Sequence, residues 1–357
     1  MQIIEFIIEI VFIFIISTVI FDLIHYLLHQ MQGSQISIFR RLGALHDHHH
    51  LFFDDQLVTH KELWPMNLKY HLVPELITQL AVTSCFFFFV NPMAVGVTLG
   101  CEMLIFIYVL SIKGLDFNHL HNPKLSKKPS MAFFVMPNYH YQHHLDPKNY
   151  FSSWFRIFDF LFGYSCSLKG KCYLVTGASG KFGSQLCVRL EKYGAKVIKI
   201  KYGKDFDHDR YDGFKDKIKL ADGLILCHGS KGDCQWSHVD SYIEMIESFL
   251  ENTKADLPEI WALGSEMEFH PAFFKADKPY EKAKRDFALY AKKLYHREDI
   301  LYRHIVPAAF QSSYNPAPIS ARPFSWLALF FVQRGFRYIP LTYTGMAYLN
   351  YFKFKRE

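Results

Sequence analysis

Histidine is concentrated in the first part of this chain, in a pattern that can hold metal ions. Thirteen of its 19 histidines precede residue 150. Neutral imidazole nitrogen binds iron, copper, zinc and nickel, and residues three or four apart on a helix share a face, so a spaced cluster can direct several nitrogens to one point. Eight histidines form three such clusters, which are His25 and His29; His46, His49 and His50; and His140, His143 and His144. Since a zinc site takes three or four protein ligands, eight indicate two metal ions.

Isolated histidines have a simpler interpretation. Such a residue is more often packed or hydrogen-bonded than bound to a metal, and we therefore interpret His48, His60 and His71 as neighbours of the clusters or surface residues. His119 and His121 lie in a polar segment just before the last cluster. We include both as candidate ligands, because a further pair would complete the metal site.

The segments that must position these histidines are apolar. The chain has 357 residues, of which 50% are hydrophobic and 17% aromatic, and this is more than is usual for a soluble domain. Residues 3–24 form an apolar run long enough to span a membrane, and residues 72–90 and 93–112 form two more, separated by Asn91 and Pro92. These runs predict a transmembrane bundle that includes a helical hairpin.

Basic residues accompany the histidine clusters, and the positive-inside rule places such segments on the cytosolic face of a membrane. The residues concerned are Arg40, Arg41, Lys61, Lys69, Lys113, Lys124, Lys127 and Lys128. Seven cysteines without a Cys-x-x-Cys motif predict no zinc finger, iron–sulfur site or disulfide framework. The net charge of +6 suits an anionic membrane surface, and no basic stripe with interleaved aromatics indicates nucleic acid as a partner.

Residues 20–165 resemble the membrane fatty acid hydroxylase / sterol desaturase superfamily. Its HxxxH, HxxHH and HxxHH boxes match the three clusters in order, and residues 149–164, NYFSSWFRIFDFLFGY, resemble its closing segment. The resemblance implies a diiron site at the cytosolic end of a short helical bundle, where dioxygen is activated to hydroxylate an unactivated C–H bond of a lipid. Such chemistry needs a metal, because no side chain cleaves dioxygen by one-electron steps.

A second kind of motif begins at residue 170. A short apolar strand, a glycine-rich turn, an amphipathic helix and a second strand predict the start of a Rossmann unit. Gly177 allows the tight turn, Gly180 lets the backbone approach a pyrophosphate, and Gly183 allows the helix to pack closely on the strand. The candidate cofactor-binding residues of the domain are Thr176, Gly177, Ser179, Gly180, Lys181, Phe182, Gly183, Lys201, Asp222, Gly229 and Pro307.

Lysines at the end of the second strand indicate which nicotinamide cofactor binds. Lys199, Lys201 and Lys204 favour the 2′-phosphate of NADP(H), whereas an acidic residue there would accept hydrogen bonds from the ribose of NAD(H). Asp205 or Asp207 could still serve NAD(H), and the lysines could be only a solvated strand end.

Three residues further along are candidate catalytic groups. Tyr280 and Lys284 are four apart and share a helical face, where the ammonium can lower the pKa of the phenol enough for proton transfer to or from a carbonyl or alcohol oxygen. This arrangement resembles the short-chain dehydrogenase/reductase family. The resemblance implies that Ser265 orients the substrate oxygen and that the strand ending at Pro307 meets the nicotinamide.

The second part of the chain also departs from that family. The glycine turn is TGxxGxxG, the usual Asn-Ala-Gly is Cys227-His228-Gly229, and Ala308 replaces a glycine. The asparagine that often completes the catalytic set has no clear match. Cofactor binding is therefore the firmer prediction, and turnover the weaker one.

These observations predict three domains. Residues 1–165 form an all-α transmembrane helical bundle with a histidine metal site, and residues 166–320 form an α/β Rossmann-like domain with a parallel sheet. Residues 321–357 mix short apolar runs with basic residues, which predicts an amphipathic tail in the membrane interface. The alternative is a helix packed on the sheet of the domain itself.

The two active parts predict a bifunctional membrane lipid oxidoreductase. Oxygenation needs electrons delivered singly, whereas a nicotinamide delivers hydride, so we expect an external donor such as ferredoxin or cytochrome b5 to reduce the irons. The second domain would then interconvert an alcohol and a carbonyl on the same lipid. A sterol, a carotenoid, a fatty acyl chain and a fatty aldehyde all remain open as substrates.

Three alternatives remain. The order of the domains resembles plant cuticular-wax aldehyde-to-alkane proteins and bacterial fused sterol desaturase/short-chain dehydrogenase proteins, which leaves open the conversion of an acyl group or aldehyde to a hydrocarbon. The Rossmann domain could instead be a silent NADP sensor that regulates the hydroxylase. A zinc-binding membrane scaffold is the third alternative.

Overall fold

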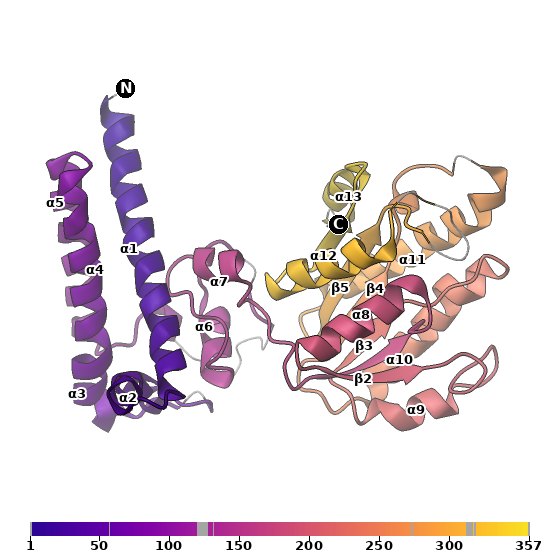
Figure 1. The fold of residues 1–357 in the computed structure, drawn as a ribbon, viewed down its shortest axis with the longest axis horizontal. Helices are drawn as coiled ribbons and strands as arrows, with labels where there is room; N and C mark the ends of the chain where they lie inside the picture. Colours follow the sequence, from indigo (N-terminus) through magenta and orange to yellow (C-terminus); the bar gives the residue numbers. More distant parts are fainter. Residues whose placement is uncertain are drawn as a thin grey trace. The chain divides into compact units, whose positions relative to one another are not determined.

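The structure is a computed structural model that describes residues 2–56, 58–119, 128–130, 132–272, 274–311, 317 and 319–355. It divides into two compact units, Met1–Ser167 and Leu168–Glu357 (Figure 1). Each unit has its own architecture. The first is helical, and the second is built on a parallel sheet.

Long helices dominate the first unit. Its elements are α1 (Gln2–Gln32), α2 (Ser37–Phe52), η1 (Lys61–Leu63), α3 (Trp64–Asn67), η2 (Leu68–Leu72), α4 (Val73–Cys85), η3 (Phe86–Phe88), α5 (Pro92–Ser111), η4 (Phe117–His119), α6 (Pro137–Leu145) and α7 (Ile157–Phe162). α4 and α5 form the predicted hairpin and pack beside α1 (Figure 1). Asn91 ends the hairpin turn and caps α5, since its Oδ1 accepts a hydrogen bond from the Met93 amide at 2.9 Å, and Pro92 takes the first helical position.

Three helical stretches are long and apolar enough to cross a membrane: Ile3–Gln32, Lys61–Phe88 and Pro92–Ser111. Many of their large apolar side chains point outward, among them Phe88, which is 86% exposed. Three polar residues in the middle of α1, in contrast, are fully buried: Ser17, Thr18 and Asp22. An apolar exterior around a polar interior is the arrangement that lipid favours.

One close crossing brings α1 and α2 together. A Cβ on Gly43 would lie 2.7 Å from the Leu28 carbonyl oxygen and from the Gln32 amide nitrogen, so only glycine allows this approach. On α1 the crossing includes the turn that carries His29, and on α2 it lies three residues before His46. It therefore brings these two histidines toward each other.

The second unit is the α/β Rossmann-like domain with a parallel sheet that the sequence predicts. Its strands are β1 (Cys172–Thr176), β2 (Lys196–Ile200), β3 (Gly223–Leu226), β4 (Glu259–Leu263), β5 (Leu301–Pro307) and β6 (Tyr338–Leu341), all parallel, in the order β2-β1-β3-β4-β5-β6. β1, β3 and β5 are buried along their whole length, as strands covered on both faces must be. The order reverses between β1 and β3, and ligands of such sheets bind at this point, beyond the carboxyl ends of the strands.

Helices cover both faces of this sheet. They are α8 (Lys181–Lys192), α9 (Asp212–Ile218), η5 (Trp236–Asp240), α10 (Ser241–Asn252), η6 (Glu266–Glu268), η7 (Lys275–Asp277), α11 (Lys278–His296), α12 (Ala321–Gln333) and α13 (Met346–Lys355). α8 and α12 pack together on one face, and α10 and α11 bury their apolar sides against the other (Figure 1).

Residues 321–357, which we expected to form a separate interfacial tail, instead complete the α/β unit. β6 extends the sheet by pairing with β5, and the Arg189 Nε of α8 donates to the Ser325 Oγ of α12 at 3.0 Å. Phe324, Ala328 and Val332 form a buried stripe at helical spacing. The apolar run that suggested a membrane interface is the packed face of α12, which is the alternative that the sequence left open.

A buried carboxylate ties three strands together. Glu259 is 1% exposed, and its Oε1 accepts hydrogen bonds from Arg303 Nε at 2.7 Å and Trp261 Nε1 at 2.8 Å. Its Oε2 accepts from Tyr173 OH at 2.9 Å and Lys171 Nζ at 3.0 Å. Burial alone would raise the pKa of Glu259, but the neighbouring Lys171 and Arg303 cations outweigh burial and hold the pKa well below its usual value.

We therefore predict that Glu259→Leu lowers the free energy of unfolding by about 3–5 kcal/mol, because it leaves Arg303 buried without its partner. Urea denaturation of the full chain in detergent measures this.

Because the folded-state pKa of Glu259 is depressed, the stabilisation is present above about pH 4 and is lost as the pH falls toward the folded-state pKa. Asp299→Asn, which breaks the exposed pair with Arg297, is the control and should cost under about 1 kcal/mol. Equal losses for the two variants would contradict the prediction.

Candidate metal centre and nucleotide-binding site

The structure gathers nine of the ten predicted metal ligands into two groups. Within each group the candidate ligand atoms lie within 4.8 Å of one another. The first group is His25, His29, His46, His50 and His143, and the second is His49, His119, His140 and His144. His121 lies outside the described residues. The second and third sequence clusters are each divided between the two groups, because neighbouring helical positions point in different directions.

The spacing of the imidazole nitrogens suits metal coordination. The Nε2 atom of His143 lies 3.0 Å from His25 Nε2 and 3.2 Å from His29 Nε2, and the Nε2 atoms of His140 and His144 are 3.1 Å apart. With metal–nitrogen bonds of about 2.1 Å, ligands at right angles are about 3.0 Å apart and tetrahedral ligands about 3.4 Å. On average, the observed distances between nitrogens are nearer the value for ligands at right angles. Five donors in one group also exceed the four of a tetrahedral zinc site.

Hydrogen bonds on the outer side of the rings fix their orientation. They join His25 Nδ1 to the Phe151 carbonyl oxygen at 3.0 Å, His143 Nδ1 to the Asn149 carbonyl oxygen at 2.8 Å, His49 Nδ1 to Asn67 Oδ1 at 3.2 Å, and His119 Nδ1 to Asp116 Oδ1 at 2.7 Å. Each acceptor holds the proton on Nδ1 and leaves the Nε2 lone pair directed inward, which is how proteins prepare histidine for a metal.

Several inner nitrogens have no other partner. In the part of the chain that the structure describes, the Nε2 atoms of His46, His49 and His50 are buried without a hydrogen bond. Burial lowers the pKa of His50 to about 3, so its ring is neutral at physiological pH. Buried polar atoms are nearly always satisfied. Two cations among these imidazoles would satisfy them, so the donor set fits the metal centre that the sequence predicts.

His71 also lies beside the histidine groups, although the sequence did not indicate it as a candidate ligand. It is 9% exposed, and its ring stacks on that of His49 with centroids 3.9 Å apart. It lies in the π-helical turn Leu68–Leu72, a rare feature that often marks functional sites. The signal in the sequence was its four-residue spacing to Glu75 and Gln79 on an otherwise apolar helix. His48 and His60 lie in neither group.

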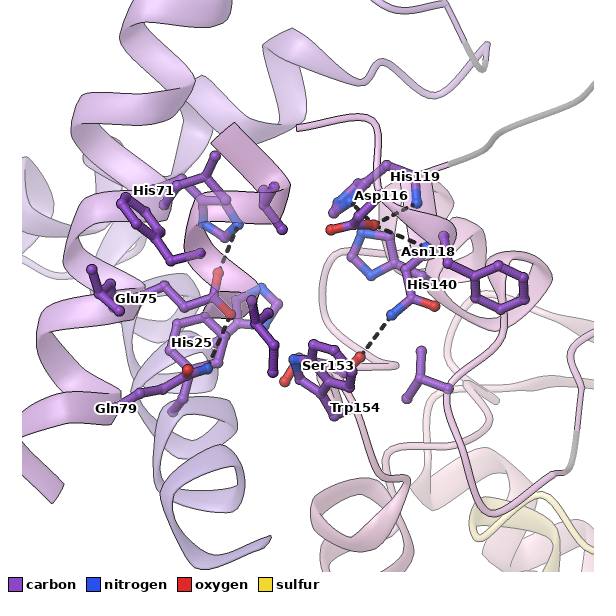
Figure 2. A pocket seen from close by; sticks show the side chains of 18 of the residues that line it. His25, His71, Glu75, Gln79, Asp116, Asn118, His119, His140, Ser153 and Trp154 are labelled. Atoms are coloured by element: carbon purple, nitrogen blue, oxygen red, sulfur yellow. Dashed lines mark hydrogen bonds and ion pairs between the residues drawn. The ribbon is translucent and has the colours of Figure 1, made fainter. Parts of the chain in front are cut away.

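A cavity of about 320 Å³ opens beside the second histidine group (Figure 2). His49, His119 and His140 line one side of it, and the remaining wall comes mainly from apolar side chains of α1, α4, α5 and the segments around residues 117 and 151. Its volume is at the lower end of the range for small-molecule sites. An apolar ligand in this cavity would lie against the second histidine group.

In the α/β unit, the predicted glycine turn joins β1 to α8 at the carboxyl edge of the sheet. Gly177 has a φ of +63°, and a Cβ there would lie 2.5 Å from the Cys227 carbonyl group. A Cβ on Gly183 would lie 2.2 Å from the Gly177 oxygen. Both positions therefore need glycine, as predicted. The exposed residues at the start of α8, where an anion would be favoured, are Ser179, Gly180 and Lys181.

The other residues that the sequence predicts to contact the cofactor lie in several different environments. Asp222 precedes β3 at the amino edge of the sheet, where its Oδ2 accepts a hydrogen bond from the Cys172 amide at 2.7 Å. It is therefore far from the glycine turn, and the prediction that Asp222 contacts the cofactor is wrong. Thr176 and Phe182 are buried and serve packing. Lys201 is exposed directly after β2, and Pro307 ends β5, so both lie at the carboxyl edge.

The acidic alternatives for NAD(H) are already engaged. Asp205 is buried, accepts a hydrogen bond from the Lys201 amide at 2.8 Å and pairs with Lys217. Asp207 pairs with Arg210 at 2.8 Å. Both carboxylates thus have structural partners, whereas the surface beside the end of β2 keeps its lysines.

The candidate catalytic residues converge beyond the end of β4. Lys284 is 1% exposed, its Nζ donates to the Leu263 carbonyl oxygen at 2.6 Å, and burial lowers the pKa of the ammonium to about 8. Burial raises the pKa of Tyr280 to about 12, opposed by a hydrogen bond with the Ser265 side chain. The sequence prediction that Lys284 lowers this pKa does not hold, because burial dominates. A phenol with this pKa is protonated at neutral pH and suited to donate a proton.

Two histidines complete this site, and the sequence reasoning gave neither a role. His228 joins Thr176 Oγ1 at 2.7 Å to Ser241 Oγ at 2.9 Å. The ring of His238 lies edge-on to that of Tyr280, with centroids 5.0 Å apart. A Cβ on Gly229 would lie 1.9 Å from His238 Cε1, so this glycine, predicted to contact the cofactor, makes room for the imidazole.

Comparison with known proteins gives one relative by sequence. The chain is 28% identical over 333 residues to the monoglucosyldiacylglycerol epimerase of Synechocystis sp. (strain ATCC 27184 / PCC 6803 / Kazusa), with 79% of each chain covered. This share is larger than either unit, so the match includes residues of both. No model of a known protein family matches the sequence.

Solved structures that are similar cover about half of the chain. A short-chain dehydrogenase from Burkholderia cenocepacia J2315 in complex with NADP has 14% identity and a TM-score of 0.44, covering 53% of this chain and 95% of its own. A short-chain dehydrogenase/reductase from Serratia marcescens BCRC 10948 has 15% identity and a TM-score of 0.42, covering 49% and 96%.

The glycine turn yields a prediction. Gly183→Ala should lower the free energy of unfolding by about 1–3 kcal/mol and weaken NADPH binding, because its Cβ would push apart the turn and α8. Denaturation and NADPH fluorescence titration of the full chain measure the two effects. Gly232→Ala is the control: its Cβ would meet only Ser230 Oγ, at 3.6 Å, and it should change neither. Unchanged NADPH affinity in Gly183→Ala would place the nucleotide elsewhere.

Proposed function

We propose that this protein is a membrane-bound lipid oxidoreductase with two sites: a diiron centre held by the two histidine groups, and an NADP(H) site that interconverts an alcohol and a carbonyl. The observation that carries the proposal is the pair of converging imidazole groups with outer hydrogen bonds, beside an apolar cavity between membrane-length helices. When bound, the irons would supply the dioxygen chemistry that no side chain can.

The chain's own residues prepare the first site. His143 belongs to the first group and His140 and His144 to the second, so α6 would hold both metals at a short separation. Phe151, Asn149 and Asp116 orient the rings through the outer hydrogen bonds described above. The apolar wall of the cavity would exclude water and place a hydrocarbon segment against the second group.

The membrane position supports an external electron donor. Arg40, Arg41, Lys61, Lys69 and Lys113 belong to the same end of the bundle as the histidines, so by the positive-inside rule the metal centre would face the cytosol. A soluble carrier such as ferredoxin or cytochrome b5 could dock there. Nothing in the sequence of the α/β unit resembles a flavin, haem or iron–sulfur site that would divide a hydride into single electrons.

In the α/β site the protonated Tyr280 would give its proton to the carbonyl oxygen of the lipid as hydride arrives from NADPH at the carbonyl carbon. Ser265 would position that oxygen, and the Lys284 ammonium would stabilise the resulting phenolate. The reverse steps oxidise the alcohol and return the hydride to NADP⁺. Lys201 and its neighbouring lysines favour the 2′-phosphate.

A second function, epimerisation of a lipid-bound sugar, is favoured by the Synechocystis relative, whose match includes both units. Oxidising a ring hydroxyl to a ketone and returning the hydride to the opposite face inverts that carbon with no net oxidation. Tyr280 and one NADP⁺ would suffice. In this alternative the metal centre need not oxygenate the lipid, and the product has the same mass as the substrate.

Metal content tests the first site. The full chain purified after growth with iron should contain about two irons, and His143→Ala should lose at least one, because His143 lies within 3.2 Å of two other ligands. His60→Ala, which changes a histidine outside both groups, is the control and should keep both irons. Inductively coupled plasma mass spectrometry gives the count. Zinc without iron in the wild type would contradict the oxygenase function and favour the zinc-binding scaffold.

Lipid products test the second site. Tyr280→Phe should reduce the carbonyl or epimer product of expressing cells by 10²–10⁴-fold, roughly the worth of a positioned proton donor, while NADPH binding persists. Tyr343→Phe, an exposed tyrosine, is the control. Lipid mass spectrometry with chromatography separates an added oxygen, a carbonyl and an equal-mass epimer. Unchanged lipids in Tyr280→Phe would show that the α/β unit only binds the nucleotide, or takes no part.

A further inference from the structure

A stripe of polar side chains leads away from the histidine groups along α4. His71, Glu75, Gln79 and Thr83 follow one another at intervals of four residues, so they share one face of the helix. At 1.5 Å per residue, the stripe is about 18 Å long. His71, Gln79 and Thr83 are buried, and the rest of α4 is largely apolar. Polar groups inside an apolar bundle are costly and usually functional.

The stripe is linked by side-chain contacts. His71 Nε2 lies 3.8 Å from Glu75 Oε2, and Gln79 Nε2 donates to Glu75 Oε1 at 3.2 Å, as Figure 2 shows. At the other end, Thr83 Oγ1 donates to Glu102 Oε1 of α5 at 2.7 Å. Ser17 Oγ of α1 donates to the same oxygen at 2.9 Å. Three helices thus direct polar groups toward one interior region.

One atom of this region has no partner. Glu102 is 1% exposed, and its Oε2 is buried without a hydrogen bond among the residues that the structure describes. Both neighbouring hydroxyls donate to Oε1, which leaves Oε2 available. Glu75, Gln79 and Glu102 also line the cavity beside the histidines. A buried carboxyl oxygen without a hydrogen bond is unfavourable, so a partner from the contents of the cavity is expected.

We propose that the cavity binds its lipid by a hydroxylated group, with the hydroxyls bonded to Glu102, Gln79 and Glu75. This inference rests on the proposed function and specifies its substrate class: a lipid with a hydroxylated ring, in place of a plain acyl chain. The cavity of about 320 Å³ suits one ring, and Trp154 adds an aromatic surface to its wall. His49, His119 and His140 line the same cavity as Glu75, Gln79 and Glu102.

Two kinds of lipid supply this chemistry, a sterol and a lipid-bound sugar. Each can be tested against a partner that lacks only the hydroxylated group. The sterol pair is cholesterol and 5-cholestene, and the sugar pair is monoglucosyldiacylglycerol and diacylglycerol acetate. The full chain is reconstituted in phosphatidylcholine nanodiscs that contain a few mole per cent of one probe, transferred into mild detergent, and the retained probe is quantified by mass spectrometry.

The wild type should retain the hydroxylated member of one pair about tenfold better than its partner, and the pair that responds identifies the source. Gln79→Leu should bring that ratio close to one, since it removes the amide and preserves apolar volume. Glu102→Leu should do the same. Ile77→Leu is the matched control, because Ile77 is on α4 but 61% exposed on the outer side. Thermal melting and iron content show whether each variant folds, and Gln79→Leu remains informative if Glu102→Leu does not.

Equal retention of both members of each pair by the wild type would overturn the proposal. So would a Gln79→Leu variant that loses lipid product in cells but retains the hydroxylated probe, since the stripe would then carry protons and not bind the lipid. The retention assay needs no turnover. A wild type that prefers a hydroxylated probe but contains no iron would therefore support the binding site and contradict the diiron function.

Discussion

Burial of imidazoles in an apolar interior is the constraint on which the first unit depends. An imidazole in an apolar interior stays neutral, and its two nitrogens need one donor and one acceptor contact. Backbone carbonyl oxygens and the side chains of Asn67 and Asp116 supply the outer contacts. The inner nitrogens face one another in two groups, and a cation bound in each group would satisfy them. The close crossing at Gly43 and the short helix α6 follow from the need to bring these rings together.

The α/β unit obeys a different constraint, the packing of a parallel sheet that is covered on both faces. The strand order reverses between β1 and β3, which is the point where ligands of such sheets bind, and the glycine turn lies at the carboxyl ends of these strands. Residues with a plausible cofactor role but a position at the other edge, such as Asp222, are excluded by this geometry. The same geometry collects Ser265, Tyr280 and Lys284 beyond β4. Whether a residue can contact the cofactor therefore depends on the end of the strand at which it lies, and not on its residue type.

Sequence reasoning succeeded where a local pattern has one geometric outcome. Histidines four apart in sequence, such as His46 and His50 or His140 and His144, do share a group, although the second and third clusters are each divided between the two groups. A glycine triplet between strand and helix predicted the turn between β1 and α8. It failed where the outcome depends on tertiary packing. The ring of His71 reaches His49 only through a π-helical turn, α12 buries the run that suggested a membrane interface, and burial outweighs Lys284 in setting the pKa of Tyr280. The pairing of Glu102 with Ser17 and Thr83 joins three helices and has no signature within any one of them.

The two proposed sites place the same demand on the substrate. Hydride transfer in the α/β unit requires a carbon that carries a hydroxyl or carbonyl oxygen, and the polar stripe of the bundle offers hydrogen-bonding partners to a hydroxylated ring. A saturated hydrocarbon chain would satisfy neither. Oxygen insertion would create such a carbon, and epimerisation would only invert one, so the two candidate functions differ in whether the hydroxyl is a product or already part of the lipid. Glu102 Oε2 has no hydrogen bond among the described residues, and a lipid that is hydroxylated before it enters the cavity would provide a partner for it. The proposed binding site therefore favours a first-site substrate that is itself an alcohol.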